Sequence, residues 1–236
     1  MNERKFKAIT FSYDDGITQD KRLISLFNKY GLKCTFNINS ALFGKAGALV
    51  REDVTVAHVR PRIEEIREIY EGHEVAAHTL HHPMLPTLTD EEIINEVEND
   101  RLALSEVVGY EVVGMAYPGG GQNNDDRVAN IIKNNTGIRY ARTISSTHSF
   151  LPQENLYRFN PTIHQYGEFD RTFQLAEQFL EMKAESPSIF YIWGHSYELD
   201  IRDTWERMEE LCKLISGRDD IFYGTNSEIL LSDDWK

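Results

Sequence analysis

The amino-acid sequence predicts an α/β protein, built as a distorted TIM-like (β/α) barrel of seven or eight strands. Strand-like and helix-like apolar patterns alternate along the whole chain, the order that produces a parallel sheet covered by helices. The length of 236 residues suits one such barrel. No linker, internal repeat or low-complexity tract divides the chain, so we expect a single domain over residues 1–236. An open doubly wound sheet is the alternative arrangement of the same elements.

Short apolar runs rich in β-branched and aromatic residues mark the expected strands. The first run, KAITFSY, covers residues 7–13, and the second, KCTFNIN, covers residues 33–39. Residues 40–59 fit neither a strand nor a helix pattern and are expected to form an irregular loop. The other expected strands are residues 73–79, 112–118, 139–145, the extended segment 156–164, 188–195 and 221–225.

Helical periodicity fills the intervals between these strands, and capping residues mark several helix ends. Gly31 ends the first helix, and Pro61 and Gly72 bracket the second. Thr89 and Glu92 form a capping box at the start of the third. The expected helices are residues 21–30, 61–72, 89–109, 125–135, 171–184 and 204–217.

Composition and charge exclude several classes of function. The formal net charge of −13 opposes binding to nucleic acid, whose phosphates would be repelled. The N-terminal stretch MNERKFKAITF lacks the apolar run of a signal peptide, and no segment is apolar enough to span a membrane. If Met1 is the natural start, we expect a cytoplasmic protein. Cys34 and Cys212 lie in apolar surroundings and are expected in the core, without a disulfide.

Nucleotide-binding motifs are also absent. The first strand-to-helix turn, YDDGITQD, lacks the three glycines of a dinucleotide-binding fold. Residues 119–121 are three glycines after a strand, but no lysine follows them to make a phosphate-binding loop.

Polar and titratable side chains stand where the expected strands end. In a (β/α) barrel the carboxyl ends of the strands form one rim, which carries the active site. A single histidine near a strand is usually structural, but several histidines and carboxylates on the same rim predict a functional site. The rim positions are Asp14, Asp15, Asn39, His78, Tyr117, Pro118, Arg142, His164, His195, Thr225 and Asn226.

The segment HTLHHP predicts part of a metal site. His78 and His82 are four residues apart, so one helical turn would bring both imidazoles to one side. With one carboxylate they make the three-ligand set of a catalytic zinc ion. His81 would then face away. The upstream histidine of HEVAAH, His73, is five residues before His78, does not match a zinc-protease motif, and is expected to be structural at the opposite end of the barrel.

The two adjacent carboxylates of SYDDG raise the question of their purpose, because a simple turn needs only one Asp before Gly. With a metal site on the same rim, one carboxylate can bind the metal while its neighbour takes a proton from water. The charge of the metal offsets the repulsion between Asp14 and Asp15 and keeps both ionised near neutral pH.

Four segments, FSYDDG, GHEVAAHTLHHP, AYPGG and YIWGH, resemble the motifs of the polysaccharide deacetylases in order and approximate spacing. This family is the NodB-homology group, or carbohydrate esterase family 4, and its fold is a distorted (β/α) barrel. By position, the resemblance implies that Asp14 is the catalytic base and His195 the general acid. It likewise implies that Asp15, His78 and His82 bind one divalent metal, zinc first, with cobalt, nickel or manganese as alternatives.

The sequence departs from this family at three points. Ala116 occupies the position of an arginine that orients the base, and Gly119 that of a tyrosine. The family's Asp-x-x-Asp-Trp element has no counterpart, and WGHSYE is an unusual setting for His195. We expect Arg142, on the fifth strand, to replace the missing arginine; the alternative is a surface ion pair.

The resemblance implies metal-dependent hydrolysis of a non-peptide amide, most simply N-deacetylation of an amino sugar or oligosaccharide. A backbone N–H between Tyr117 and Gly119 would stabilise the oxyanion, and His164 is the next candidate for the acid. Hydrolysis of a cyclic amide or ureide is a second possibility. A third is a non-catalytic barrel that binds a glycan through Tyr117, Trp193 or Tyr197, although Trp193 is expected in the core. Trp205 is expected on a helix face and Trp235 in the tail.

Overall fold

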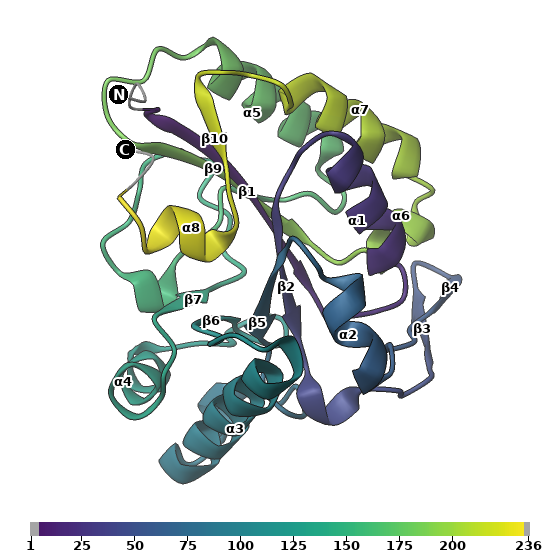
Figure 1. The fold of residues 1–236 in the computed structure, drawn as a ribbon, viewed down its shortest axis with the longest axis vertical. Coiled ribbons are helices and arrows are strands. Elements are labelled where there is room, and N and C mark those ends of the chain that lie inside the picture. The colour runs from purple at the N-terminus through teal and green to yellow at the C-terminus, as the bar shows by residue number, and fades with distance from the viewer. Residues whose placement is uncertain (1–4, 234–236) are drawn as a thin grey trace.

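Eight parallel strands form one curled sheet in the computed structural model, which describes residues 5–233 (Figure 1). The central strand β1 pairs with β2 on one edge and β9 on the other. The order across the sheet is β7-β6-β5-β2-β1-β9-β8, with β10 also pairing with β1. The strands are β1 (Lys7–Asp14), β2 (Cys34–Ile38), β5 (Glu74–Ala77), β6 (Gly114–Ala116), β7 (Tyr140–Arg142), β8 (Ile163–His164), β9 (Ser188–Gly194) and β10 (Ile221–Tyr223).

One extended segment joins the two edges of this sheet. Phe159 makes a parallel bridge with Arg142 of β7, and its N–H and C=O bond to Ala141 and Thr143. A few residues later, β8 pairs with β9. The sheet is therefore curled into the distorted (β/α) barrel that the sequence predicted, and not into an open doubly wound sheet.

Helices cover the outside of the sheet. Figure 1 shows α1, α5 and α7 beside β1, with α2, α3 and α4 beyond β2 and β5. No helix within residues 5–233 is long and apolar enough to cross a membrane. The longer helices are α1 (Asp20–Lys29), α2 (Ile63–Ile69), α3 (Asp90–Val108), α4 (Asp126–Asn135), α5 (Phe169–Glu181) and α7 (Trp205–Ile215); the short ones are α6 (Tyr197–Ile201) and α8 (Asn226–Leu230).

Capping explains where α3 begins and ends. The Thr89 side chain accepts the N–H of Glu92, whose carboxylate accepts the N–H of Thr89, so the predicted capping box is present. Gly109 ends the helix in the left-handed conformation, with φ 82°.

Alternation along β1 separates an apolar outer face from a polar inner face. Phe11 and Tyr13 pack against the helices in the main core, together with Leu23 and Phe27 of α1. The intervening residues Thr10, Ser12 and Asp14 point the other way, into the barrel. Most of the hydrophobic core therefore lies between the sheet and the helices. Cys34 and Cys212 are both buried and unpaired, as expected.

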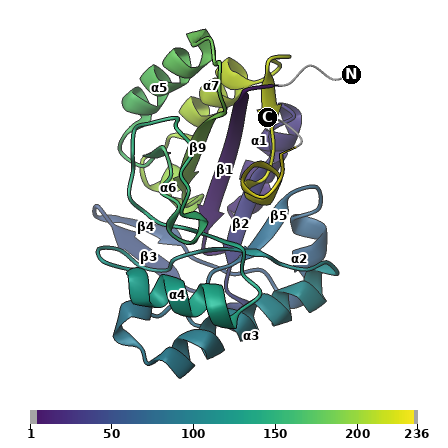
Figure 2. The same cartoon turned by 90° about the vertical axis from the view of Figure 1, so that its left-hand side faces the viewer.

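The structure corrects the prediction for residues 40–59. They contain a short 3-10 helix, η1 (Ser40–Leu42), and an antiparallel hairpin of β3 (Ala48–Arg51) and β4 (Val54–Ala57). The turn residues Glu52 and Asp53 have φ angles of 52° and 61°, the two-residue turn that matches strand twist. No Asn-Gly or Asp-Gly pair marks this turn, so the local sequence contains little indication of a hairpin. Figure 2 shows the hairpin beside the carboxyl end of β1.

The predicted rim position of Asn226 is wrong. β10 pairs only with Lys7 to Ile9, the first half of β1, so the chain after it does not reach the rim. Asn226 begins α8 and is fully buried inside the barrel, where it bonds to Thr10, Ser12 and Thr35. Trp205 lies at the start of α7, whereas Trp235 lies outside the described residues.

Candidate active site

A cleft of about 340 Å³ opens at the carboxyl ends of the strands. Parallel register brings these ends together: Asp14 is aligned with Asn37, Ala116 with Arg142, and His164 with Trp193. The cleft is lined by Asp14, Asp15, Arg51, His78, His82, Tyr117, Gly119, Gly120, Ile144, His164, Trp193, His195, Tyr197 and Glu198. Of the predicted site residues, Pro118, Arg142 and Asn226 do not line it.

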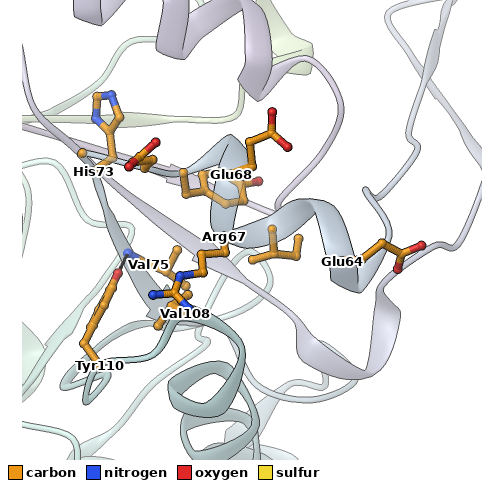
Figure 3. A pocket seen from close by; sticks show the side chains of 11 residues that line it. Glu64, Arg67, Glu68, His73, Val75, Val108 and Tyr110 are labelled. Carbon is orange, nitrogen blue, oxygen red and sulfur yellow. Dashed lines mark hydrogen bonds between the residues drawn. The ribbon is translucent and has the colours of Figure 1, made fainter.

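A second pocket, of about 530 Å³, lies beside α2 at the opposite end of β5 (Figure 3). Its histidine, His73, accepts the N–H of Cys34 at Nδ1, and Nε2 lies 3.1 Å from the Asn28 side-chain oxygen. Burial lowers the pKa of His73 to about 4. Both ring nitrogens are therefore committed to a neutral, structural role, as predicted. The histidine of this larger pocket is therefore not available as a base, and the smaller cleft is the candidate active site.

The turn after β1 separates the two carboxylates. β1 ends at Asp14, and Asp15 then adopts the left-handed conformation with φ 79°, uncommon for a residue other than glycine. Gly16 follows with φ 60°, and a Cβ there would lie 2.5 Å from the Ile38 side chain. The third residue of DDG must therefore be glycine, and the turn allows the two neighbouring carboxylates to make different contacts.

Asp15, His78 and His82 form a group that fits a divalent metal. Their ligand atoms lie within 4.8 Å of one another, and Asp15 Oδ1 is 3.9 Å from His78 Nε2 and 3.6 Å from His82 Nε2. Ligands of a tetrahedral zinc ion are separated by about 3.4 Å, given bond lengths of about 2.1 Å. His78 Nδ1 donates to the Ala116 carbonyl at 2.9 Å, which leaves the Nε2 lone pair free. Burial lowers the pKa of His78 to about 4, so the ring is neutral, as a ligand must be.

The two histidines meet through a turn and not through the predicted helical turn. Thr79 and His82 have φ angles of 68° and 63°, and the His82 N–H donates to the Thr79 hydroxyl. The imidazole rings of His78 and His82 consequently lie 4.9 Å apart. His81 is exposed and pairs with Glu96 at 2.7 Å, facing away as expected.

The second oxygen of Asp15 is held by a residue that sequence reasoning missed. His58, just after β4, places Nε2 3.2 Å from Asp15 Oδ2, and Arg60 Nη1 lies 3.4 Å from His58 Nδ1. Because arginine only donates, Nδ1 accepts and Nε2 carries the proton toward Asp15. This arrangement fixes the carboxylate so that Oδ1 faces the histidines. His58 was missed because the hairpin that carries it was expected to be a loop.

Asp14 is buried and forms an ion pair with Arg142. Arg142 Nη2 contacts both oxygens of Asp14, and the Asn37 amide donates to Oδ1 at 2.8 Å. Burial alone would raise the pKa of Asp14, but Arg142, His78 and His195 together outweigh burial and keep that pKa below its usual value. Arg142 lies beside Ala116 in the register of β6 and β7 and above the Trp193 ring. It therefore occupies the place next to the missing arginine that the sequence predicted.

His195 and His164 share a buried carboxylate. Glu198 is 1% exposed, and its oxygens lie 3.0 Å from His195 Nδ1 and 3.1 Å from His164 Nε2. Burial alone would lower the pKa of His195, but the negative charges of Glu198, Asp15 and Asp14 together outweigh burial, and that pKa rises to about 9. Glu198 is the second residue that sequence reasoning missed, although it stands in the unusual WGHSYE segment at three residues from His195.

The loop after β6 places the backbone N–H of Gly119 at the cleft. The Tyr117 N–H donates to the Arg142 carbonyl, and Pro118 has no N–H. The Gly119 N–H makes no hydrogen bond to another described residue. Gly119 has φ 81°, and a Cβ there would lie 2.3 Å from Met84 Sδ. The position therefore requires glycine.

The sequence matches the model of one protein family, described as Polysaccharide deacetylase, over residues 1–141. This match covers more than half of the chain. No curated protein matches the sequence.

Solved structures of deacetylases are similar in fold at low sequence identity. The peptidoglycan deacetylase PdaC from Bacillus subtilis has a TM-score of 0.57 and 15% identity, covering 97% of this chain and 91% of that chain. The family 4 carbohydrate esterase from Streptomyces lividans has a TM-score of 0.57 and 12% identity, covering 93% of this chain and 92% of that chain. The Streptococcus pyogenes deacetylase PplD has a TM-score of 0.51 and 18% identity. This match covers 63% of this chain and only 61% of that protein. At these identities the similarity establishes the fold.

Alanine at Asp15, His78 or His82 is expected to weaken divalent-metal affinity by about 100-fold or more, because each substitution removes one of the three candidate ligands. Competition titration with a chelator and elemental analysis after dialysis measure the effect. His81→Ala is the matched control, since His81 is adjacent but pairs with Glu96. Full metal content in the His82→Ala protein would remove His82 from the ligand set.

Proposed function

The chain belongs to the polysaccharide deacetylase family, and on that premise we propose that it is a metal-dependent hydrolase of a non-peptide amide bond. The proposed reaction is N-deacetylation of an N-acetylated amino sugar or short oligosaccharide in carbohydrate metabolism. One observation carries the proposal: a single cleft combines a ligand triad, an ionised buried carboxylate and a histidine whose pKa is about 9. Its volume of about 340 Å³ favours a substrate group of monosaccharide size.

Asp15, His78 and His82 would hold the metal. Two imidazoles and one carboxylate suit zinc, with cobalt, nickel and manganese as alternatives, better than magnesium. A divalent cation in this site supplies positive charge that polarises the acyl carbonyl and acidifies water. The ligand triad leaves room for water and substrate because this chain contributes only three ligands from the described group.

Asp14 is the proposed base. Its Oδ2 lies 4.0 Å from His78 Nε2, close to the ligand group, but both oxygens of Asp14 are held by Arg142. The ion pair with Arg142 restrains this carboxylate and keeps it ionised. Asp14 takes the proton of the attacking water, and a positioned base of this kind contributes about 10² to 10⁴ in rate.

The free Gly119 N–H is the proposed oxyanion donor. Negative charge develops on the acyl oxygen when water attacks, and a preorganised N–H stabilises that charge more than it stabilises the neutral carbonyl. Gly119 stands at the position of the family's tyrosine. The proposed mechanism uses only the backbone N–H at this position, so it does not need the tyrosine side chain.

His195 is the proposed general acid. Nδ1 faces Glu198, which leaves Nε2 to deliver a proton to the departing amine. The charge of Glu198 keeps the imidazole protonated at neutral pH. Glu198 thus acts as a positioning residue through His195.

The metal-loaded protein is expected to release acetate from N-acetylated amino sugars, and Asp14→Asn to lower kcat by about 100-fold or more without metal loss. Acetate release and metal content are measured on the same preparations. If excess metal restores the activity of Asp14→Asn but not that of Asp15→Asn, then Asp14 is the metal ligand and Asp15 the base. Turnover of cyclic amides or ureides alone would favour the ring-opening alternative, and metal binding without any turnover would favour a glycan-binding barrel.

Arg142→Met is expected to lower kcat by about 10-fold or more and to move the acid limb of the pH profile upward. Loss of the guanidinium removes the charge that lowers the pKa of Asp14, so the base protonates at higher pH. Arg142→Lys keeps the charge without the planar fork and should recover part of the loss. Arg139→Met, an exposed arginine just before the same strand, is the control. An acid limb that does not move contradicts this role.

The alkaline limb of kcat is expected near pH 9, where His195 loses its proton. Glu198→Gln removes the negative charge that favours the imidazolium, so the limb should shift to lower pH while metal binding is retained. His195→Ala should abolish the limb. An unchanged limb in the His195→Ala protein would point to another acid, with His164 next.

A further inference from the structure

The β3–β4 hairpin delivers an arginine to the cleft. Its turn is held by Glu52, which bonds to Arg202 and Tyr166. Its base is held by Gln19, which donates to the Ala57 carbonyl at 2.7 Å. Between these attachments, Arg51 extends from the end of β3 and lines the cleft. The hairpin is thus fixed at both ends, and Arg51 is presented from a restrained element.

The Arg51 guanidinium makes one hydrogen bond to the protein and has further N–H donors. Nη1 donates to Glu198 Oε1 at 3.1 Å, and the group lies 5.6 and 5.8 Å from the Tyr166 and Tyr197 rings. Neither Nε nor Nη2 donates to another of the residues from 5 to 233, and 41% of the side chain is exposed. Arg51 therefore lines the cleft with unpaired N–H groups of a planar fork, which suits carboxylate or phosphate oxygens.

One carboxylate cannot neutralise all the positive groups around it. Glu198 Oε1 lies 3.1 Å from Arg51 Nη1 and 3.0 Å from His195 Nδ1. The other two carboxylates of the cleft are engaged elsewhere, Asp14 with Arg142 and Asp15 with His58. Arg51 therefore keeps positive charge on one wall of the cleft, although the chain as a whole carries −13. A local field of this sign attracts anions that the rest of the surface repels.

Arg51 stands on the side of the cleft where the amine departs. Arg51 and His195 meet the same oxygen of Glu198, and His195 is the group that protonates the leaving nitrogen. The part of the substrate nearest Arg51 is consequently the amine portion and not the acyl group.

We propose that Arg51 binds an anionic oxygen group, a carboxylate or a phosphate, on the amine portion of the substrate. The substrate class is then a small N-acylated compound that carries such a group, in contrast to a neutral glycan. The assignment of the amine portion rests on the proposed function, whereas binding of the anion to Arg51 does not.

Three probes that share one sugar test this inference: N-acetylglucosamine, its 6-phosphate, and N-acetylmuramic acid, which adds a carboxylate. Binding to the metal-loaded protein is measured by calorimetry, and acetate release by kcat/KM. At least one anionic probe is expected to bind about 10-fold or more tightly than the neutral parent. The phosphate and the carboxylate probes distinguish the two anion sources.

Arg51→Met is expected to remove the preference for the anion and to leave binding of the neutral parent unchanged; Arg51→Lys should keep part of it. Arg207→Met is the matched control, because Arg207 on α7 is equally exposed at 41% and pairs with Asp170 away from the cleft. Equal binding of all three probes, or a preference that survives Arg51→Met, overturns the inference. Anion-selective binding without acetate release would instead overturn the proposed deacetylation and leave the anion site standing.

Discussion

The buried ion pair between Asp14 and Arg142 is the constraint on which the site depends. The two side chains are 2% and 0% exposed, and an isolated charge at such depth would be too costly to remain ionised. Paired, they tie the end of β1 to the end of β7, which lies four positions away in the sheet. The curled sheet brings the ends of these distant strands together. Curling therefore places Arg142 beside Asp14, and this contact keeps Asp14 ionised.

The polar interior of the barrel extends this constraint inward. Asn37 donates to Asp14 and to Ser12, and Ser12 accepts from the Asn226 amide. These groups are buried and must bond to one another, because water is excluded. The hydrophobic core is displaced to the outer face of the sheet, where the helices pack. Asn226 is thereby connected to Asp14 through Ser12 and Asn37, although Asn226 does not line the cleft.

Local patterns in the sequence were sufficient for the order of the elements and for much of the site. The end of the first apolar run predicted that Asp14 and Asp15 lie at the rim, and HTLHHP predicted that His78 and His82 converge. Their local structure was predicted less well, because the turn between them uses positive φ angles at Thr79 and His82. Such angles leave no clear signal when the residues concerned are not glycine.

The sequence by itself determined which chemical groups end each strand, since strand periodicity and parallel register are short-range properties. Only the tertiary structure decided which group partners which. His58 and Arg51 gain their roles from a hairpin without a turn motif. Glu198 lies three residues from His195, but its second histidine partner, His164, is 34 residues away in the chain. Arg142 was predicted to orient Asp14, but its burial beside Ala116 and under the bridge to Phe159 follows from how the strands pair in the curled sheet. These pairings depend on which strands become neighbours and on how far the sheet curls, and neither is encoded by residues close in sequence.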